Sequence, residues 1–455
     1  MNIMNPATEE VIATLTEDDT LSLERKMTSL KDAQPGWQAV SLMERVAIVK
    51  QFAILLDINR DTLAITLTNE VGKPLQQSKN EINGAITRIN WLTDNAVRYL
   101  SDEVMSSDTT ITEKIVYEPL GVVCNISAWN YPYLVGVNVF VPALLAGNSV
   151  FYKPSEYTSL TGLHIQSLLN EAGVPDNVFQ AAIGGARVGE ALLQLPLNGY
   201  YFTGSYKTGK YIYEKLAPKM VPVQCELGGK DPVYITDDIE DIAAVAIGTA
   251  DGAFYNNGQS CCSVERIYVH EKNYDAYIDA FVKEVNTWKR GNPLEEGIYL
   301  GPISRGEQLA ILEKQTADAV EKGATLLTGG KRVGGKGYYF EPTVLTNVNH
   351  GMLVMQEESF GPIIGIMKVK DDEEAIHLMQ DNLYGLTAAV YSNSLERAEA
   401  ILNKIDAGSG YWNCCDRVSA ALPWSGRRHS GFGATLSHVG LRAFTKPKAY
   451  HLREA

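Results

Sequence analysis

A cysteine and a glutamate lie at positions where a thiol and a carboxylate could react together. The loop NNGQSC places Cys261 just before an apolar, strand-like segment, in a chain that has six cysteines. Glu226 ends the apolar segment VPVQCE, where a carboxylate is costly to bury without a role. No candidate histidine accompanies either residue, so the pattern favours a nucleophilic thiol with a separate carboxylate base over a Cys–His pair. Taken alone, Cys261 could also be an inert buried thiol and Glu226 an ion-pair or helix-capping residue.

Two short motifs supply groups of other kinds. Asn130 lies in WNYP, directly after an apolar segment, where its side-chain amide could donate a hydrogen bond to a developing oxyanion. An Asx turn before the proline explains the same residues equally well. In ESFGP, Glu358 and Phe360 precede a Gly-Pro turn.

Two further motifs are typical of a nucleotide site. Lys153 and Glu156 of KPSE follow a strand-like segment, and α/β sheets bind nucleotides at the carboxyl ends of parallel strands. The turn FTGSYKTG supplies Gly204 and Ser205 between a strand-like and a helical segment. Its glycine spacing is GxxxxG, so the GxGxxG dinucleotide fingerprint is absent.

The segments that must position these residues change in character after residue 101. Short runs rich in Val, Ile and Tyr alternate with segments of helical spacing, which predicts parallel sheets with helices on both faces. The strands expected in the first series are 120–126, 148–153, 178–183, 200–202 and 232–235. A second alternating series follows, so we expect two α/β domains in tandem, joined near Gly228 and Gly229.

The two ends of the chain are predicted to differ from this alternation. The first hundred residues are expected to be helical, since apolar residues in 36–57 recur every three or four positions on one helical face. These apolar residues are Leu42, Val46, Val49, Ala53 and Leu56. Segment 115–119 and the tail after Phe444 lie outside both series, which makes them candidates for a small projecting element.

Composition and charge exclude several classes of protein. The 455 residues are 45% hydrophobic and 21% charged, which is ordinary for a globular chain of about three domains. A net charge of −14 without a basic run argues against nucleic acid or an anionic membrane as partner. The uncharged stretch 119–152 is long enough to cross a bilayer. Its two prolines and four asparagines favour a buried sheet with functional loops instead.

The cysteines and the first residues indicate where the protein works. The cysteines have no zinc-binding spacing, and four of them form the adjacent pairs Cys261-Cys262 and Cys414-Cys415. The first residues show no signal-peptide pattern. We therefore expect a reducing, cytoplasmic environment, no structural disulfide and no metal.

The order of the motifs resembles the NAD(P)-dependent aldehyde dehydrogenase superfamily. WNYP, KPSE, FTGS, ELGGK, GQSC, ESFGP and PWSGRRHSGFG follow one another as in that family, and the resemblance begins at NPATEEVI and continues through VGKPLQQSKNEI. It implies an α/β fold with a Rossmann-like NAD-binding domain (1–103 and 120–228) and a catalytic α/β domain (229–428). It also implies a small β oligomerisation element (104–119 and 443–455) and a homodimer or homotetramer.

The resemblance implies a role for each motif residue. Cys261 would be the nucleophile, Glu226 the general base, and Asn130 part of the oxyanion hole. Lys153 and Glu156 would hold the adenosine ribose of NAD, with NADP as a second cofactor. The other residues implied to bind the cofactor are Ile126, Ser127, Trp129, Gly185, Gly189, Phe202, Gly204, Ser205, Leu227, Glu358 and Phe360.

The chemistry implied by the resemblance suits these residue types. The Cys261 thiolate attacks the aldehyde carbon, and the resulting thiohemiacetal gives its hydride to the nicotinamide and becomes a thioester. Glu226 then deprotonates the water that hydrolyses the thioester to the carboxylic acid. A thiol suits this task because it ionises near neutral pH more readily than a hydroxyl and leaves readily from a thioester.

Substrate specificity is where this chain departs from the family pattern. The usual PFGG is PWSG here, in a segment that forms the substrate mouth in relatives. The residues that map to the substrate tunnel are Tyr131, Leu134, Tyr255, Cys262 and Trp424. The aromatic residues favour an apolar or cationic aldehyde, whereas Arg417 could reverse that preference by pairing with a substrate carboxylate. Cys262 is explained either as a packing residue or as a thiol that protects Cys261 from over-oxidation.

Three other functions are weighed against this one. A CoA-acylating relative would transfer the acyl group instead of hydrolysing it, and Glu226 argues against that outcome. A non-enzymatic structural relative would have no need for Cys261, Glu226 and Asn130 together. A thiol hydrolase that works without nicotinamide would leave KPSE, FTGS and ESFGP unexplained.

Overall fold

A six-stranded sheet organises the first half of the chain in the computed structural model, which describes residues 1–454. Its strand order is β19-β9-β8-β5-β6-β7. The strands are β5 (Val122–Ile126), β6 (Ser149–Lys153), β7 (Phe179–Ala181), β8 (Gly199–Thr203), β9 (Val223–Glu226) and β19 (Gly431–Phe432). Strands β5 to β9 pair in parallel, and β19 returns late in the chain to pair antiparallel with β9.

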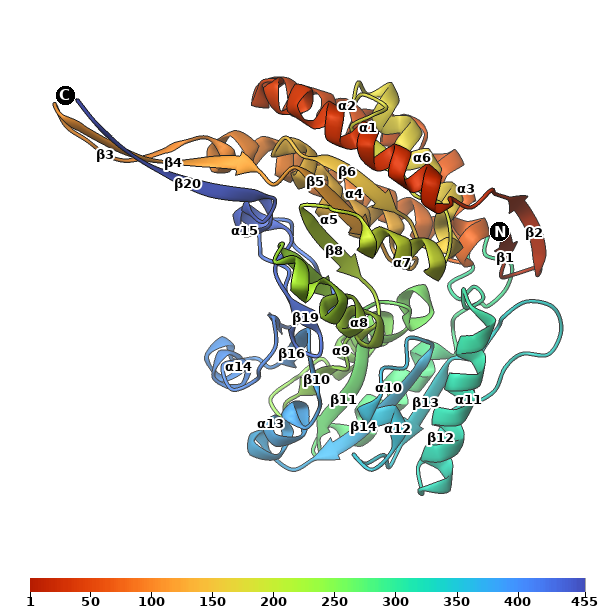
Figure 1. Cartoon of the computed structure of the whole chain (residues 1–455). Helices are drawn as coiled ribbons and strands as arrows, with labels where there is room; N and C mark the ends of the chain where they lie inside the picture. The colour runs from red at the N-terminus through yellow and green to blue at the C-terminus, as the bar shows by residue number, and fades with distance from the viewer. Residues whose placement is uncertain (455) are drawn as a thin grey trace.

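Helices cover both faces of this sheet. Every residue of β5, β6 and β8 is buried, as expected of parallel strands between two helical layers. One face packs against α2 (Leu42–Ile58), α3 (Arg60–Val71), α4 (Leu75–Leu100), α5 (Pro132–Leu145) and α6 (Ser159–Glu171). The other face packs against α1 (Thr20–Ala39), α7 (Ala186–Gln194) and α8 (Tyr206–Leu216). Figure 1 shows these helices above the second half of the chain.

A seven-stranded sheet organises the second half, in the order β12-β13-β14-β11-β10-β16-β17. Its strands are β10 (Asp231–Ile235), β11 (Val264–His270), β12 (Thr325–Thr328), β13 (Thr343–Thr346), β14 (Ile363–Val369), β16 (Thr387–Tyr391) and β17 (Ser409–Trp412). All neighbours pair in parallel except β12 with β13. Helices α9 (Ile242–Phe254) and α10 (Tyr274–Val285) cover one face. Helices α11 (Gly306–Glu321), α12 (Leu353–Gln356), α13 (Asp372–Gln380) and α14 (Leu395–Leu402) cover the other.

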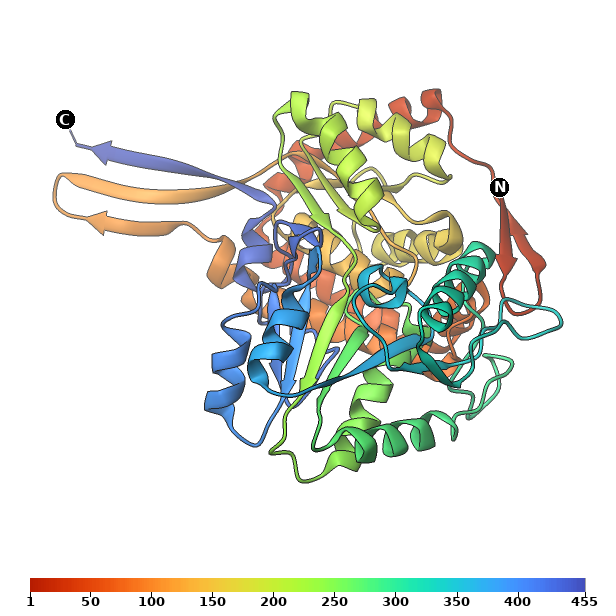
Figure 2. The same ribbon diagram turned by 90° about the horizontal axis from the view of Figure 1, so that it is seen from below.

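A three-stranded antiparallel arm projects from these two layered bodies. It consists of β3 (Glu103–Ser107), β4 (Ile111–Pro119) and β20 (Thr445–Arg453), which follows α15 (Ser437–Arg442). Figures 1 and 2 show the arm extending away from the rest of the molecule. The projecting element expected around 115–119 and after Phe444 is therefore present, while Ala455 lies outside the described residues. A hairpin, β1 (Asn2–Asn5) and β2 (Glu10–Thr14), lies at the other end of the chain, and β15 (Tyr384–Gly385) pairs with β18 (Arg427–Arg428).

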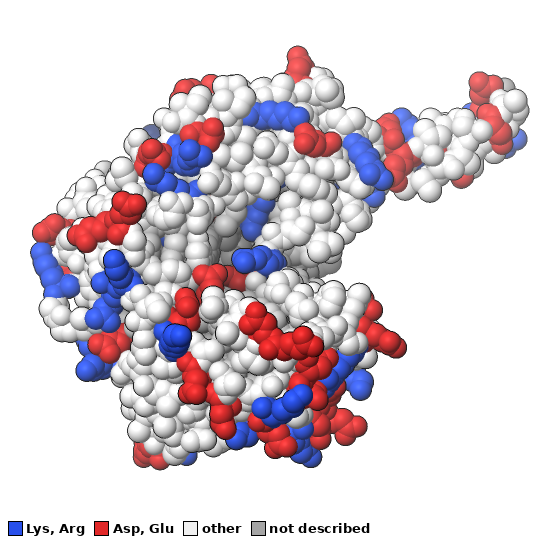
Figure 3. Space-filling model, turned by 180° about the vertical axis from the view of Figure 1, so that it is seen from behind, with Lys and Arg blue, Asp and Glu red and all other residues white. Residues whose placement is uncertain are grey.

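The carboxyl edge of the first sheet faces the amino edge of the second. Lys153 and Glu226 are the last residues of β6 and β9, so they lie at the carboxyl edge of the first sheet. Cys261 precedes β11, so it lies at the amino edge of the second sheet. Because the chain passes directly from β9 to β10 through Leu227–Lys230, these two edges face each other. The sequence motifs therefore converge between the two bodies, and the surface seen in Figure 3 is hollowed between them.

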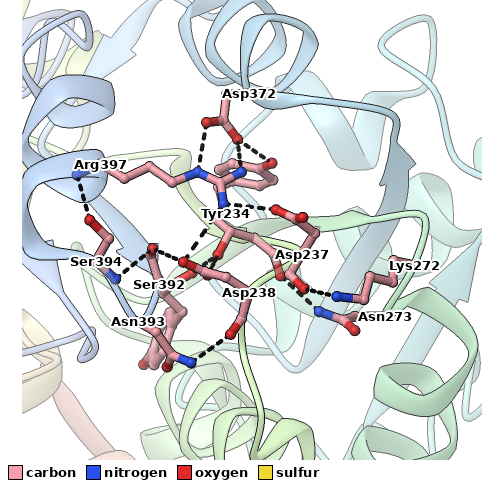
Figure 4. Close-up of polar contacts among 12 residues, drawn as sticks. Tyr234, Asp237, Asp238, Lys272, Asn273, Asp372, Ser392, Asn393, Ser394 and Arg397 are labelled. Carbon is pink, nitrogen blue, oxygen red and sulfur yellow. Dashed lines mark hydrogen bonds and ion pairs between the residues drawn. The ribbon is translucent and has the colours of Figure 1, made fainter.

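The carboxyl edge of the second sheet carries a network of hydrogen bonds and ion pairs. Arg397 binds Asp372 through Nε and Nη2, at 2.8 and 2.6 Å, and its Nη1 lies 2.7 Å from Asp237. Ser392 and Asn393, which follow β16, donate to the side chain and the backbone of Asp238. Figure 4 shows these contacts joining the loops after β10, β14 and β16. The network ties the strand ends together on the side away from Cys261.

The predicted secondary structure matches most of the alternating segments, with two corrections. The strand at 232–235, expected in the first series, is β10 and pairs with β11 and β16 in the second sheet. The first hundred residues are mainly helical from residue 20 onward, whereas residues 2–14, expected to be helical, contain the β1–β2 hairpin. Segment 36–57, predicted as helical on one face, contains the end of α1 and most of α2, with a break at Val40 and Ser41. Ser41 ends the continuity because its hydroxyl accepts from the Glu44 N–H while the Glu44 carboxylate accepts from the Ser41 N–H. The uncharged stretch 119–152 forms the expected buried strands, and between them the buried helix α5. Among the described residues, no helix has the length and hydropathy needed to cross a bilayer.

The division of the chain into functional domains at residue 228 stays a prediction. The sheets themselves change between β9 and β10, which Gly228 and Gly229 separate. β19, however, lies after residue 428 and belongs to the first sheet.

Candidate active site

The loop that carries Cys261 is held in a strained but anchored conformation. Asn256 and Asn257 adopt left-handed backbone angles, with φ of 53° and 56°. The Asn257 amide donates to the carbonyls of Gly301 and Pro302 at 3.0 Å, and the Asn256 amide donates to Gln259 O at 3.2 Å. Such backbone strain persists where the surroundings fix it, and it is concentrated at functional sites. The loop therefore presents Cys261 from a rigid base.

A buried chain of contacts ties Asn130 to this loop. The Asn130 side-chain amide donates to Gln259 O at 3.0 Å. Its own backbone carbonyl accepts from Lys73 Nζ at 2.7 Å, and Lys73 forms a fully buried ion pair with Glu81. Since an amide carries two N–H groups, one remains for a ligand near Cys261.

Glu226 is a buried carboxylate with partners on one oxygen. Thr435 Oγ1 and Gln224 Nε2 both donate to Glu226 Oε1, the latter at 3.1 Å. Burial raises the pKa of Glu226 to about 7, against the opposing hydrogen bond from Thr435 and the charge of Arg88. A carboxyl group with that pKa exchanges a proton near neutral pH, as a general base requires.

Two cavities meet at Cys261 and Glu226. One has a volume of about 350 Å³ and the other about 420 Å³, and both are lined by Val135, Thr203, Glu226 and Cys261. The smaller cavity is lined by all five residues predicted for the substrate pocket, which are Tyr131, Leu134, Tyr255, Cys262 and Trp424. Arg417, considered for substrate pairing, is exposed and also lines this cavity. A thiol and a carboxylate thus lie between two chambers with different walls.

The larger cavity brings together most of the residues predicted to bind the cofactor. Those that line it are Ser127, Trp129, Lys153, Glu156, Phe202, Gly204, Ser205, Leu227, Glu358 and Phe360, together with Asn130. Gly185 instead lines an adjoining cavity of about 680 Å³, to which Glu156 also contributes. Ile126 and Gly189 line neither cavity: Ile126 packs in the core, and Gly189 lies beneath the Lys153 side chain.

Groups suited to a dinucleotide lie along this larger cavity. The buried Lys153 Nζ is 3.8 Å from the half-exposed Glu156 carboxylate, which leaves both a donor and an acceptor for a ribose. Ser127 Oγ is buried without a hydrogen-bond partner among the described residues. The Trp129 and Phe360 rings meet edge to face at 5.4 Å and form an aromatic wall. The residues present therefore fit a nucleotide cofactor.

Glu358 reaches this cavity because a glycine makes room for it. A Cβ on Gly228 would lie 2.1 Å from Glu358 Oε1, and the Gly229 N–H donates to that same oxygen at 3.1 Å. Burial raises the pKa of Glu358 to about 8, with the nearby Glu265 carboxylate adding to the effect. The motifs ELGGK and ESFGP, more than 100 residues apart, are thus parts of one wall.

Cys262 faces the smaller cavity and not the larger one. Its thiol donates to Asp416 Oδ1 at 3.0 Å. A hydrogen bond with Cys261 and burial raise the pKa of the Cys262 thiol. A thiol held in its protonated form is a poor nucleophile, which favours the packing explanation over the protective one. Both explanations stay predictions.

Several residues of the site were not singled out in the sequence, among them Lys73, Glu81, Arg88, Asp416 and Thr435. Lys73 and Glu81 position Asn130, and their one signal is the stretch VGKPLQQSKNEI. Arg88 and Asp416 line the smaller cavity. Nothing in the segments around those two residues distinguishes them from surface charges.

Comparison with known proteins gives consistent matches. The family model described as "Aldehyde dehydrogenase family" matches residues 1–450. Aminoaldehyde dehydrogenase 1, peroxisomal, of Pisum sativum is 34% identical over 98% of this chain and 91% of its own length. Glutarate-semialdehyde dehydrogenase of Pseudomonas putida is 32% identical over 98% and 93%. A point variant of betaine aldehyde dehydrogenase from Staphylococcus aureus, solved with NAD⁺, superposes with a TM-score of 0.95 at 31% identity, covering 100% of this chain and 92% of its own.

Proposed function

Because this chain belongs to the aldehyde dehydrogenase family, it oxidises an aldehyde to the carboxylic acid with NAD(P)⁺, and we propose that the reaction proceeds through a covalent bond to Cys261. The observation that supports this assignment is the position of Cys261 and Glu226, which line both cavities. A nucleophile there is open to both cavities, so it could meet an aldehyde from one and a cofactor from the other.

The first half of the reaction belongs to Cys261 and Asn130. The Cys261 sulfur attacks the aldehyde carbon, a C–S bond forms, and the carbonyl electron pair moves to oxygen. The free N–H of the Asn130 amide and the Cys261 backbone N–H stabilise that oxyanion. The residues of the larger cavity, Lys153, Glu156 and Glu358 among them, would hold the dinucleotide. A bound nicotinamide would supply the hydride acceptor that is needed for the thiohemiacetal on Cys261 to become a thioester.

The second half of the reaction belongs to Glu226. Its carboxylate takes a proton from a water, the water oxygen adds to the thioester carbon, and the Cys261 thiolate leaves as the acid forms. The raised pKa of Glu226, about 7, makes this carboxylate a stronger base than an exposed glutamate. A hydrolytic ending is therefore favoured over acyl transfer to CoA, the runner-up.

Glu156 and Lys153 give the cofactor site its selectivity. A carboxylate that accepts from both ribose hydroxyls favours NAD, because it repels a 2′-phosphate. Lys153 lies close enough to Glu156 to offset part of that repulsion. We therefore propose NAD as the preferred cofactor and NADP as the weaker one.

Rapid mixing tests these assignments. With NAD⁺ and an aldehyde, Glu226→Gln should release one equivalent of NADH and then stall, because the thioester forms but is not hydrolysed. Cys261→Ser should give no burst while NAD⁺ still binds. Addition of CoA to the stalled Glu226→Gln enzyme distinguishes the runner-up, since renewed turnover with acyl-CoA formation would identify an acyl transferase. A full burst from Cys261→Ala would refute the covalent assignment.

We also propose that the arm joins copies of the chain. Strands β3, β4 and β20 extend beyond the two bodies and expose Val104, Met105 and Leu452. A projecting sheet with open strand edges is a template for pairing with another chain, and its exposed apolar side chains would be buried by that pairing. We therefore propose a homodimer or homotetramer, and light scattering after gel filtration measures which of the two forms.

We also propose a cytoplasmic location. All six cysteines are free thiols, which suits a reducing environment.

A further inference from the structure

Arg88 brings a positive charge into the smaller cavity from helix α4. Its Nη1 donates to Leu134 O at 3.1 Å and to Asn138 Oδ1 at 3.0 Å, and both acceptors are neutral. Within residues 1–454, its Nε and Nη2 have no hydrogen-bond partner, and no carboxylate oxygen lies within ion-pair distance of the guanidinium. Since neither nitrogen is among the fully buried unpaired atoms, the unused donors are open to the cavity.

The acidic residues of the same cavity already have protein partners. Asp416 accepts from the Cys262 thiol, and Asp251 accepts from the Tyr299 hydroxyl at 2.5 Å. Glu226 accepts from Thr435 and Gln224. Arg88 and the exposed Arg417 are the two cations of this lining, and among the described residues neither has a carboxylate within ion-pair distance. Arg88 differs from Arg417 in being largely removed from solvent. A guanidinium removed from water without a carboxylate partner is unfavourable unless a ligand supplies the anion.

Burial and the neighbouring groups act on the pKa of this arginine in opposite directions. Desolvation lowers the pKa of Arg88, while the nearby Cys262, Glu226 and Cys261 raise it. An arginine remains protonated even so, because its ordinary pKa is above 12. The cavity therefore holds a permanent positive charge in the neighbourhood of Cys261.

We propose that Arg88 binds a carboxylate at the far end of the aldehyde substrate, so that the preferred substrates are short aldehydes with a terminal carboxylate. This inference rests on the proposed function, because it assumes that the aldehyde carbon lies at Cys261. A guanidinium offers a planar pair of donors that matches a carboxylate. The aromatic and apolar wall formed by Tyr131, Leu134 and Trp424 then contacts the methylene chain.

The other charges of the cavity favour a singly charged anion over a doubly charged one. Asp251 and Asp416 lie in the same lining, and their repulsion is about twice as large for a dianion such as a phosphate monoester as for a carboxylate. Arg417 is exposed at the mouth, where water screens its attraction for a substrate. Arg88, and not Arg417, is therefore the residue that selects a carboxylate. This assignment reverses the preference for apolar or cationic aldehydes that the aromatic residues alone suggested.

A competing role for Arg88 is to adjust the pKa of Glu226. Its charge lowers the Glu226 pKa, although no direct contact joins the two side chains. If that were its role, loss of the charge would slow hydrolysis equally for every aldehyde and would move the pH profile of kcat upward. If Arg88 binds substrate, the loss depends on whether the aldehyde carries a carboxylate.

The test compares a five-carbon aldehyde bearing a terminal carboxylate with its methyl ester and with pentanal, each with NAD⁺. Wild type should prefer the carboxylate in kcat/KM. In Arg88→Met the ratio of kcat/KM for the carboxylate to that for the methyl ester should fall about a hundredfold, chiefly through KM, as expected when a charge-assisted contact is removed. The matched control is Arg98→Met, on the exposed part of the same helix, where the ratio should equal that of wild type.

Three outcomes would overturn the inference. These are a wild type without preference for the carboxylate, an Arg88→Met enzyme that loses activity equally on all three aldehydes, and a ratio that collapses in Arg417→Met instead. If Arg88→Met does not fold, the wild-type preference and Arg88→Lys, which keeps the charge without the planar fork, provide the test. Absence of an NADH burst with all three aldehydes would instead count against the proposed function.

Discussion

Replacement of Glu226 by glutamine should stop turnover and should stabilise the folded protein relative to wild type. This difference in the free energy of unfolding should grow as the pH rises. Both hydrogen bonds to this side chain, from Thr435 and Gln224, end on Oε1, and an amide oxygen can accept them in the same way. The substitution therefore removes the titratable proton and little else. It isolates the energetic effect of holding a buried general base in the folded protein.

The magnitude follows from the pKa of Glu226, which burial raises from 4.5 to about 7. Below pH 4.5 the carboxyl group is protonated in the folded and unfolded chains, and it makes no difference to stability. As the pH rises, the unfolded chain releases the proton first, so the folded state loses stability until the pH passes about 7. The loss approaches about 3 kcal/mol, of which about 2 kcal/mol or slightly more accumulates between pH 5 and pH 8. Glutamine has no such loss.

Urea unfolding followed by tryptophan fluorescence measures this difference. The quantity to compare is the free energy of unfolding of Glu226→Gln minus that of wild type, at pH 5 and at pH 8. All other titrating groups cancel in this subtraction. Glu399→Gln, which removes a carboxylate from the exposed side of α14, is the matched control and should show the same difference at both pH values.

A pH-independent difference for Glu226→Gln would refute the reasoning. It would mean that Glu226 ionises in the folded protein as it does in the unfolded chain. In that case the carboxylate would have no enhanced basicity at pH 7, and the argument for hydrolysis from its burial would fail. A difference that grows toward low pH would contradict even the direction of the shift.

Three further outcomes are expected. Asn130→Ala should lower kcat about 10²- to 10³-fold, which is the effect of losing one oxyanion donor. A rise in KM with kcat unchanged would contradict that role. Glu156→Gln should narrow the preference for NAD over NADP in kcat/KM, because the group that repels the 2′-phosphate is gone, whereas an unchanged ratio would assign selectivity to Lys153. After hydrogen peroxide, dithiothreitol should restore Cys262→Ala as fully as wild type, because the Cys262 thiol is held protonated against Asp416. Irreversible loss confined to the mutant, with two or three oxygens added to Cys261, would show that Cys262 protects its neighbour.

Motifs at strand ends are predictable because the strand and the residue it carries are contiguous in the sequence. Lys153 and Glu226 each end an apolar run, and Cys261 precedes one, so a rule for parallel sheets places them at sheet edges. That the carboxyl edge of one sheet would face the amino edge of the other does not follow from any single segment. It depends on how two bodies pack. The family resemblance supplied that information, and local patterns did not.

Residues that act through distant partners are invisible to local patterns. Arg88 occupies an ordinary polar position in the amphipathic helix α4, and its place in the cavity depends on Asn138 and Leu134 of α5. Thr435, which binds Glu226, comes from a segment 209 residues further along the chain. By contrast, the break between α1 and α2 has a local cause, the Ser41–Glu44 capping pair, and attention to the S-x-x-E spacing would have found it.

The two cavities share part of their lining, and this arrangement affects how the substrate specificity of the enzyme can change. Among the described residues, the two chambers have four lining residues in common, Val135, Thr203, Glu226 and Cys261, while the rest of each lining is its own. Substitutions on separate walls that share no partners combine nearly additively. Substitutions at residues such as Arg88 or Trp424, which line the smaller cavity alone, can therefore change the preferred aldehyde while the lining of the larger cavity stays the same. The four shared residues carry the chemistry, and the residues that line one cavity alone can change the substrate without touching them.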